Sequence, residues 1–247
     1  MPDTGLPAFK VATYNIHSCL GTDRKFAPER IVEVLQELDA DLVALQEVGW
    51  HLRGRQGFDQ YDFFARHTDY HVCPGVVRNH EKAHFGNALL TRGKVLAVRN
   101  IDLSVPYRVT RGAIDIDVEI GGRKVRAINA HFGLDPLERR IQFQRIVACL
   151  HDQQQAATVL MGDFNEWRLK FAALAEFNQF FPEYLAPRSF HSRRPLFRFD
   201  RIYASRQLRL SQGQAVASSL SKAASDHLPV CGQVHWAGEP EDLAPEG

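Results

Sequence analysis

Apolar and polar positions along the first part of the chain predict two strands with a helix between them. Residues 9–16 alternate in character and predict a strand, and residues 42–45 form a second, wholly apolar strand. Between these strands, Pro28 is well placed as the first residue of a helix. Apolar residues then recur at helical spacing, at Ile31, Val34, Leu35 and Leu38.

The middle of the chain predicts a β-hairpin. Over residues 114–120, aliphatic residues alternate with three acidic residues, Asp115, Asp117 and Glu119. This alternation indicates a half-buried strand with a solvated acidic face. Gly121-Gly122 forms the tight turn, and the return strand covers residues 124–130.

The second half of the chain predicts further helices and strands. Residues 137–153 are expected to form a helix, and the apolar run at 156–161 a buried strand. Another amphipathic helix is suggested by Trp167, Phe171 and Leu174. Strands are predicted at residues 199–204 and 229–236.

These elements predict an α/β fold in a single domain over residues 9–236. Strands that pair by hairpins and are interrupted by a few helices suggest two sheets packed face to face, with helices outside. Residues 1–8 are expected to be a flexible tail. Residues 237–247 are acidic and rich in proline, and we expect them to be disordered.

Composition excludes several classes of protein. The chain has 247 residues, of which 45% are hydrophobic and 24% charged, as in globular proteins. No segment approaches the roughly 18 apolar residues that a membrane span needs, and no signal peptide is visible. Four widely spaced cysteines predict reduced thiols in a cytoplasmic protein, which we expect to be a monomer. The net charge of +1 makes any preference for anions a local property.

Polar residues suited to hydrolytic chemistry follow several predicted strands. Asp163 and Asn165 come directly after the apolar run, and positions i and i+2 of an extended segment point to the same side. At the rim of a sheet, such groups suit a hard cation or a phosphoryl group. Further polar residues at strand ends are Asn15, Glu47, Asn129, His131, Asp200, Asp226 and His227. Any one of them is also an ordinary turn residue, so their combination indicates the site.

Two stretches allow more than one interpretation. Residues 50–85 show poor periodicity and contain or adjoin five histidines, at positions 51, 67, 71, 80 and 84. Their spacing matches no zinc motif, so we expect surface or hydrogen-bonded histidines rather than a zinc site. Residues 188–201 interleave arginines with phenylalanines. This stretch suits nucleic acid, an anionic lipid surface, or a solvated loop with core phenylalanines.

Eight short motifs cover nearly the whole chain, from residue 14 to residue 227. They are Tyr14-Asn15, Leu45-Gln46-Glu47, Gly86-Asn87-Ala88, Arg111-Gly112, Asn129-Ala130-His131, Gly162-Asp163-Phe164-Asn165, Phe199-Asp200-Arg201-Ile202 and Ser225-Asp226-His227. In type and order they resemble the endonuclease/exonuclease/phosphatase superfamily, which includes deoxyribonuclease I and neutral sphingomyelinases. The resemblance implies a four-layer α/β/β/α sandwich with two packed, mostly antiparallel sheets.

The resemblance also implies a metal site that takes Mg²⁺ or Mn²⁺. Glu47, with help from Asn15, is expected to hold the ion through oxygen ligands. Asp226 is expected to take a second metal or to join the catalytic network. The number of metal ions stays open.

The resemblance assigns the catalytic roles as well. His227 would be the general base on the attacking water, and Asp200 would orient its ring. Asp163 and Asn165 would position the water and the phosphate. His131 would face the phosphate, as a hydrogen-bond donor or as the acid to the leaving group.

Three more residues are predicted to bind substrate: Asn87, Arg111 and Asn129. Asn87 could instead fix a loop, and Arg111 could be a surface arginine. The choice between a phosphate contact and these simpler roles stays open at this point.

The predicted activity is metal-dependent hydrolysis of a phosphodiester by in-line attack of a water activated by His227. The alternatives are a nuclease acting on DNA or RNA, a phospholipid or phosphomonoester hydrolase, and a non-catalytic module that binds an anion. Three stretches (residues 131–140, 162–168 and 193–203) resemble a bacterial subgroup often encoded beside cardiolipin-synthase-type genes. This narrower resemblance favours phospholipid or phosphodiester metabolism over DNA repair.

Overall fold

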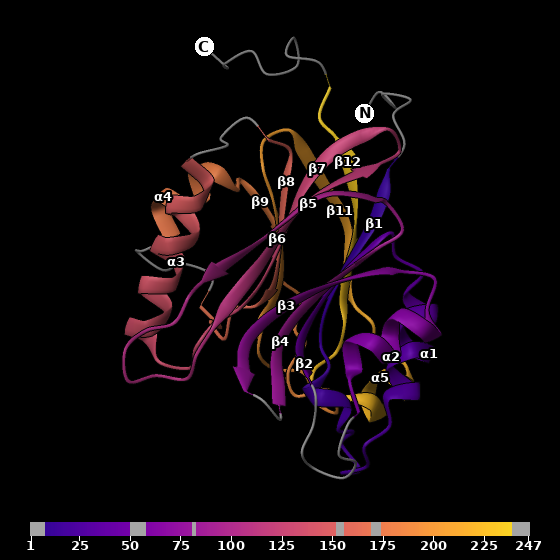
Figure 1. Cartoon of the computed structure of the whole chain (residues 1–247). Coiled ribbons are helices and arrows are strands. Elements are labelled where there is room, and N and C mark those ends of the chain that lie inside the picture. The colour runs from indigo at the N-terminus through magenta and orange to yellow at the C-terminus, as the bar shows by residue number, and fades with distance from the viewer. Residues whose placement is uncertain (1–7, 50–57, 81–82, 152–155, 169–173, 239–247) are drawn as a thin grey trace, which may run out of the picture.

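The computed structural model describes residues 8–49, 58–80, 83–151, 156–168 and 174–238. Two six-stranded sheets pack face to face, with helices on their outer faces (Figure 1). The strands of the first sheet are β1 (Phe9–Asn15), β2 (Leu42–Gly49), β3 (His71–His80), β4 (Ala83–Thr91), β11 (Leu208–Ala215) and β12 (Val230–Trp236). They lie in the order β11-β12-β1-β2-β4-β3.

The second sheet has the order β5-β6-β7-β8-β10-β9. Its strands are β5 (Lys94–Asp102), β6 (Gly112–Ile120), β7 (Arg123–His131), β8 (Thr158–Asp163), β9 (Glu183–Leu185) and β10 (Asp200–Ala204). The strand β1 runs parallel to β2, and β7 runs parallel to β8, while the other pairings are antiparallel. These mostly antiparallel sheets confirm the predicted sandwich.

Helices cover both outer faces. They are η1 (His17–Cys19), α1 (Pro28–Leu38), α2 (Gln60–His67), α3 (Pro136–His151), α4 (Leu174–Phe180) and α5 (Ser219–Ala224). The helices α1, α2 and α5 lie against the first sheet, and α3 and α4 lie against the second (Figure 1). The result is the four-layer order helix, sheet, sheet, helix.

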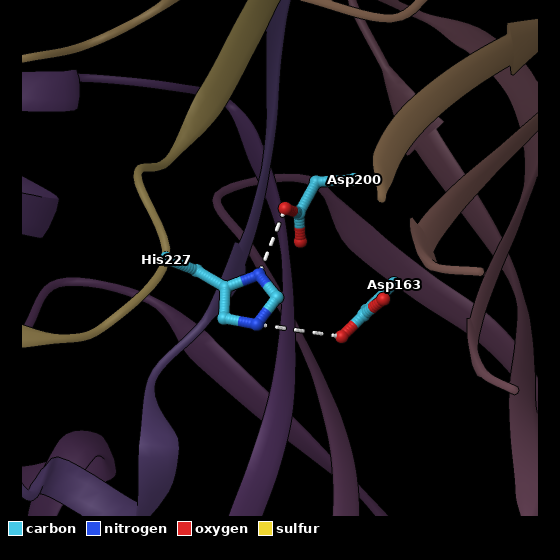
Figure 2. A group of neighbouring side chains, drawn as sticks. All are labelled: Asp163, Asp200 and His227. Atoms are coloured by element: carbon cyan, nitrogen blue, oxygen red, sulfur yellow. Dashed lines mark hydrogen bonds and ion pairs between the residues drawn. The ribbon is translucent and has the colours of Figure 1, made fainter. Parts of the chain in front are cut away.

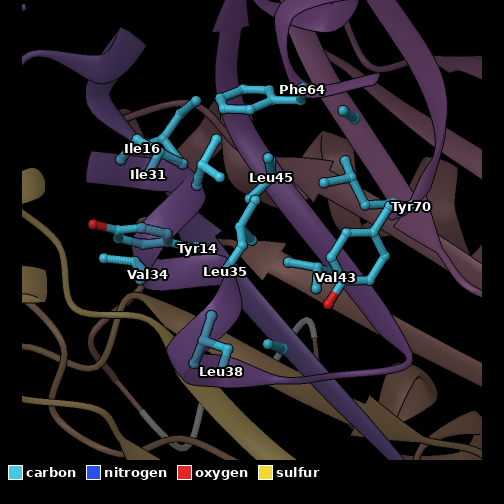
Figure 3. Packing of buried hydrophobic residues seen from close by; sticks show 14 of the residues in the cluster. Tyr14, Ile16, Ile31, Val34, Leu35, Leu38, Val43, Leu45, Phe64 and Tyr70 are labelled. Atoms are coloured by element: carbon cyan, nitrogen blue, oxygen red, sulfur yellow. The ribbon is translucent and has the colours of Figure 1, made fainter. Parts of the chain in front are cut away.

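Helix α1 shows how local sequence produces the outer layer. Pro28 occupies its first turn, and Asp39 ends it in the left-handed conformation, with φ 42°. The predicted apolar stripe is buried against β1 and β2, confirming the helix (Figure 3). The buried side chains in this layer include Tyr14, Ile31, Val34, Leu35, Leu38, Val43 and Leu45.

One prediction about the second sheet is wrong for two of its three acidic residues. Asp115 and Asp117 of β6 are only 1% and 5% exposed, whereas Glu119 is exposed as expected. Arg126 and Arg99 both form ion pairs with Asp115, at 2.7 and 2.9 Å. Arg126 also donates to the Cys149 carbonyl, which shows that α3 covers this face of the sheet. The two buried acids are therefore neutralised by arginines beneath a helix.

The region of poor periodicity is largely regular. The helix α2 and the strands β3 and β4 belong to it, while residues 50–57, His51 among them, lie outside the described residues. Near the helix suggested by Trp167, the structure describes α4, Leu174–Phe180. Trp167 lies in the preceding loop, and Phe171 is outside the described residues. Most residues of the two expected tails, 1–8 and 237–247, also lie outside the described residues.

The arrangement of strands brings the predicted site residues to one end of the sandwich. Asn15 pairs in register with Gln46, and His131 with Asp163, at the ends of two parallel strand pairs. The strand β10 begins at the same edge, where Asp200 pairs with Asp163. This end is the lower one in Figure 1.

Candidate active site

Asn15 links the two sheets at this end of the molecule. Its Nδ2 donates hydrogen bonds to Glu47 Oε1 at 3.1 Å and to Asp163 Oδ2 at 3.0 Å. Its Oδ1 accepts from the backbone N–H of His17 at 3.0 Å, which orients the amide. Asn15 therefore presents nitrogen, not oxygen, to the two carboxylates. This geometry favours holding the carboxylates over direct metal ligation.

A buried histidine lies between two carboxylates that come from the other sheet (Figure 2). The Nδ1 of His227 is 2.9 Å from Asp200 Oδ2, and its Nε2 is 3.7 Å from Asp163 Oδ2. One ligating atom from each of the three residues lies within 4.8 Å of the others. The ring can thus exchange a proton at Nε2 while Asp200 holds Nδ1.

The charges around His227 favour its protonated form. Burial of the ring opposes a positive charge, but the carboxylates of Asp200 and Asp163 outweigh it and raise the pKa of His227 to about 10. A nearby cation that offset these carboxylates would lower this pKa again.

Arg111 and His131 form the opposite side of the site. The Nη1 of Arg111 is 3.0 Å from His131 Nδ1 and 3.2 Å from its Nε2. Arginine only donates, so the ring nitrogen that accepts from it carries no proton. The Nε2 of His131 is 3.6 Å from Asp163 Oδ2. Burial, reinforced by the charge of Arg111, lowers the pKa of His131 to about 3, so this histidine is neutral at ordinary pH.

Arg111 is a half-buried cation that forms no ion pair with an acidic residue in the described part of the chain. Its Nε is buried without a hydrogen-bond acceptor, and burial lowers the pKa of its guanidinium. A buried donor without a partner is costly, so this guanidinium is suited to an anion that enters the site.

Glu47 and Asp226 border the site near η1. Burial raises the pKa of Glu47, and the hydrogen bond from Asn15 opposes this rise. Asp226 is partly exposed, with its Oδ1 3.7 Å from His17 Nδ1. Glu47 has a φ of 58°, a conformation that is uncommon outside glycine and is often found at functional sites.

The segment after β8 places Asp163 and Asn165. The N–H of Asn165 donates to Asp163 Oδ1 at 2.9 Å, and its Nδ2 donates to the Phe132 carbonyl at 2.9 Å. Gly162 has a φ of 151°, and a Cβ there would lie 1.9 Å from the Ala130 carbonyl oxygen. Glycine is therefore required where β7 and β8 approach each other before the site.

Two residues predicted to bind substrate form hydrogen bonds between the two sheets. Asn129 is fully buried, and its Nδ2 donates to the carbonyls of Leu45 and Ala88 in the other sheet. Asn87 is 1% exposed and donates to the Gly112 carbonyl at 2.8 Å, directly after Arg111. Both side chains therefore join the sheets next to the site.

Sequence reasoning missed two residues around His227. Ser189 Oγ donates to the same Asp200 Oδ2 that contacts His227. The ring of Phe190 lies 4.8 Å from the His227 ring and covers it. Both precede β10 in an irregular segment, and no local pattern marks them as neighbours of the site.

The donor set fits a divalent cation. Four carboxylates converge on this end of the sandwich: Glu47, Asp163, Asp200 and Asp226. Asp200 Oδ1 is buried without a hydrogen-bond donor among the described residues. This excess of buried negative charge and oxygen atoms suits a hard ion such as Mg²⁺. Among the described residues, Asp163, Asp200 and His227 form the group of possible metal ligands. The described histidines of residues 50–85 do not belong to this group.

Comparison with known proteins agrees with this geometry. A sequence model described as the Endonuclease/Exonuclease/phosphatase family matches residues 12–227. The uncharacterized protein YbhP of Escherichia coli strain K12 is 28% identical over 253 residues, which cover 95% of this chain and 100% of YbhP.

Solved structures show the same fold. An endonuclease/exonuclease/phosphatase from Beutenbergia cavernae aligns with a TM-score of 0.76 at 19% identity. The alignment covers 94% of this chain and 72% of the Beutenbergia chain. The mannosyl-6-phosphatase Bt3783 of Bacteroides thetaiotaomicron aligns with a TM-score of 0.71 at 16% identity, covering 92% of this chain and 100% of its own. At these identities the likeness concerns the fold alone.

Proposed function

Since the chain belongs to the endonuclease/exonuclease/phosphatase family, we propose that it is a divalent-metal-dependent hydrolase of phosphoric esters, acting on phosphodiesters. The site must bind an anionic phosphoryl group, activate a water and stabilise the leaving oxygen. Each task has a candidate among the residues gathered at the strand ends.

The observation that carries the proposal is the half-buried guanidinium of Arg111, which has no acidic partner among the described residues. Its Nη1 lies 3.0 Å from His131 Nδ1, and its buried Nε has no hydrogen-bond acceptor in the described part of the chain. A phosphoryl oxygen would supply the missing acceptor and the missing negative charge. One arginine beside a neutral histidine matches the single charge of a phosphodiester better than the double charge of a monoester.

His227 is the proposed general base. Asp200 holds its Nδ1, so Nε2 faces the space next to Asp163 where a water can be bound. Asp163 orients that water, and Asn165 supports Asp163 through its backbone N–H. The water attacks in line with the leaving oxygen. His131 stays neutral, so it stabilises negative charge as a hydrogen-bond donor rather than supplying a proton as an acid.

Glu47 and Asp226 are the proposed ligands of Mg²⁺ or Mn²⁺. Asn15 holds the Glu47 carboxylate from its amide nitrogen, a positioning role in place of the ligation expected at first. When bound, the ion would neutralise charge on the phosphoryl oxygens and lower the pKa of His227.

The test is hydrolysis of an aryl phosphodiester and the matching monoester, with Mg²⁺, with Mn²⁺ and with EDTA. We expect metal-dependent cleavage of the diester, which His227→Gln abolishes while thermal unfolding stays as in the wild type. Cleavage of the monoester alone would change the assignment to a phosphatase. If the wild type bound aryl phosphates without turnover under every condition, a non-catalytic anion-binding module would replace the proposal.

A further inference from the structure

Exposed apolar side chains lie beside the site and have no role in the proposed reaction. They belong to the β5–β6 connection, to the start of α3 with the residues before it, and to the segment after β8. We call this group the apolar rim, and its members are Tyr107, Val109, Leu134, Leu137, Ile141 and Trp167. Exposed apolar residues gathered in this way mark an interaction surface.

Polar contacts hold the three segments together. Arg108 Nη2 bonds Asp135 Oδ2 at 3.0 Å and so joins the β5–β6 connection to the residues before α3. Arg139 donates to the Leu134 carbonyl at 2.5 Å and to the Glu166 carboxylate at 3.1 Å. These bonds join the segment after β8 to α3 and to the residues before it. In Figure 1 the β5–β6 connection passes below the first turns of α3. The apolar rim is therefore a preformed surface.

The rim borders the proposed phosphate site directly. The β5–β6 connection ends at Arg111, whose guanidinium contacts His131. Gln142 of α3 donates to the Leu103 carbonyl and accepts from Gly133 N–H, which fixes the connection and the segment after β7 to the same helix. A surface that contacts the rim therefore lies next to the opening of the site.

Positive charge is concentrated in these segments. Residues 103–111, 132–145 and 166–168 contain six arginines and three carboxylates, a net charge of +3, whereas the whole chain carries +1. The rest of the chain is thus slightly negative. This local positive charge attracts an anionic partner to the segments that carry the rim.

The side-chain types favour a lipid surface over a nucleic acid. Tyr107, which is fully exposed, and Trp167 combine an apolar ring with a polar group, as side chains at membrane interfaces do. The remaining members are aliphatic and offer no ring on which a base could stack, the contact that single strands require. Arg139 and Arg145 direct their guanidinium groups to protein carbonyls, so they do not form a groove that tracks phosphates.

We infer that the apolar rim docks this protein onto a membrane surface that contains anionic phospholipid, with the site facing the head-group phosphates. The expected consequence of docking is hydrolysis of a lipid phosphodiester, and this consequence rests on the proposed function. Attachment is peripheral: apolar side chains enter the interface, and arginines contact anionic head groups. None of the described helices is long and apolar enough to span a bilayer.

The test is cosedimentation with vesicles of phosphatidylcholine alone and of phosphatidylcholine mixed with phosphatidylglycerol, in EDTA so that no hydrolysis contributes. We expect the wild type to bind the anionic vesicles at least about tenfold more strongly. The variant Leu134→Gln/Leu137→Gln/Trp167→Gln should lose at least about tenfold in binding. Arg140→Gln, at an exposed position of α3, should lose about fivefold, the effect of one charge near the surface.

The matched control is Leu96→Thr/Val98→Thr, which removes exposed apolar groups from β5 outside the rim and should bind as the wild type does. Circular dichroism melts show whether each variant folds, and turnover of the soluble aryl diester should be equal in all of them. Vesicle binding without turnover of the aryl diester would support the docking surface and contradict the proposed hydrolase activity.

Three results would overturn the inference: no binding of the wild type to either vesicle, equal binding by the rim variant, or loss of a dimer in the rim variant. Loss of single-stranded DNA binding in the rim variant, with vesicles never bound, would assign the surface to nucleic acid instead.

Discussion

His227 and Asp200 form the pair on which the proposed chemistry depends. The Nδ1 of His227 lies 2.9 Å from Asp200 Oδ2, and both side chains are buried. The same oxygen accepts a hydrogen bond from Ser189. Asp200 is thus fixed from two sides, and it fixes the ring with Nε2 directed toward Asp163.

Asp200→Asn should therefore lower kcat by roughly 10³- to 10⁴-fold with little change in KM. The amide cannot stabilise the imidazolium that forms when His227 takes a proton. Steady-state kinetics on the aryl diester measure the effect, and Asp102→Asn, at an exposed position at the end of β5, is the matched control. A larger change in KM than in kcat would place Asp200 in substrate binding.

Arg111→Lys should raise KM for the diester by about tenfold or more, although the charge is retained. A lysine cannot reproduce the planar contact with His131 and still present a second donor to the phosphate. Arg140→Lys on the exposed surface of α3 should leave KM unchanged. Equal KM values for the wild type and Arg111→Lys would show that the guanidinium does not contact the substrate.

Addition of Mg²⁺ or Mn²⁺ should raise the unfolding temperature of the wild type relative to EDTA, because an ion that binds only the folded state stabilises it. At a metal concentration about 100-fold above Kd the gain is roughly 2.7 kcal/mol. Glu47→Gln should abolish most of this gain, while Glu119→Gln, an exposed residue of β6, should keep it. Thermal melts give this readout independently of turnover.

Glu166 should make stability depend on pH at the acid end. Burial opposes its charge, but hydrogen bonds and ion pairs with Arg168 and Arg139 outweigh this and lower its pKa to about 2. A depressed pKa contributes stability that is present above the ordinary value for glutamate and is lost as the pH falls toward about 2.

The variant Glu166→Gln should therefore be less stable than the wild type by roughly 3 kcal/mol at pH 7, since two buried or half-buried arginines lose their partner. The difference should shrink as the pH falls below the ordinary range of a glutamate. Urea unfolding at several pH values measures it. A difference that is constant with pH would mean that the charge of Glu166 is not what stabilises the loop after β8.

Local pattern was sufficient for many of the elements and for many candidate residues, but not for α2 and β3, which lie where periodicity was poor. Strands and helices have different periods, so β1, α1, β6, β7 and β8 were all recognisable from spacing alone. Polar residues directly after apolar strands marked one edge of the sheets, because strand ends that pair in register reach the same edge. His227, Asp163 and Asp200 were placed together on that basis and on resemblance.

The local pattern failed where burial depends on partners far along the chain. The alternation in β6 is the same whether Asp115 faces water or an arginine under α3, and only the packing of the helix distinguishes the two. Asn129 looked available at a strand end, yet the facing sheet occupies its amide.

The sequence by itself determined the types of many of the elements and the set of chemical groups at their ends, because these depend on neighbours a few residues apart. Only the tertiary structure decided which groups meet. Asn15 contacts Asp163 across 148 positions of the chain, and three separate segments join to form the apolar rim. Such contacts depend on how two sheets and a helix pack, and packing is decided by the summed burial of many side chains rather than by any short stretch.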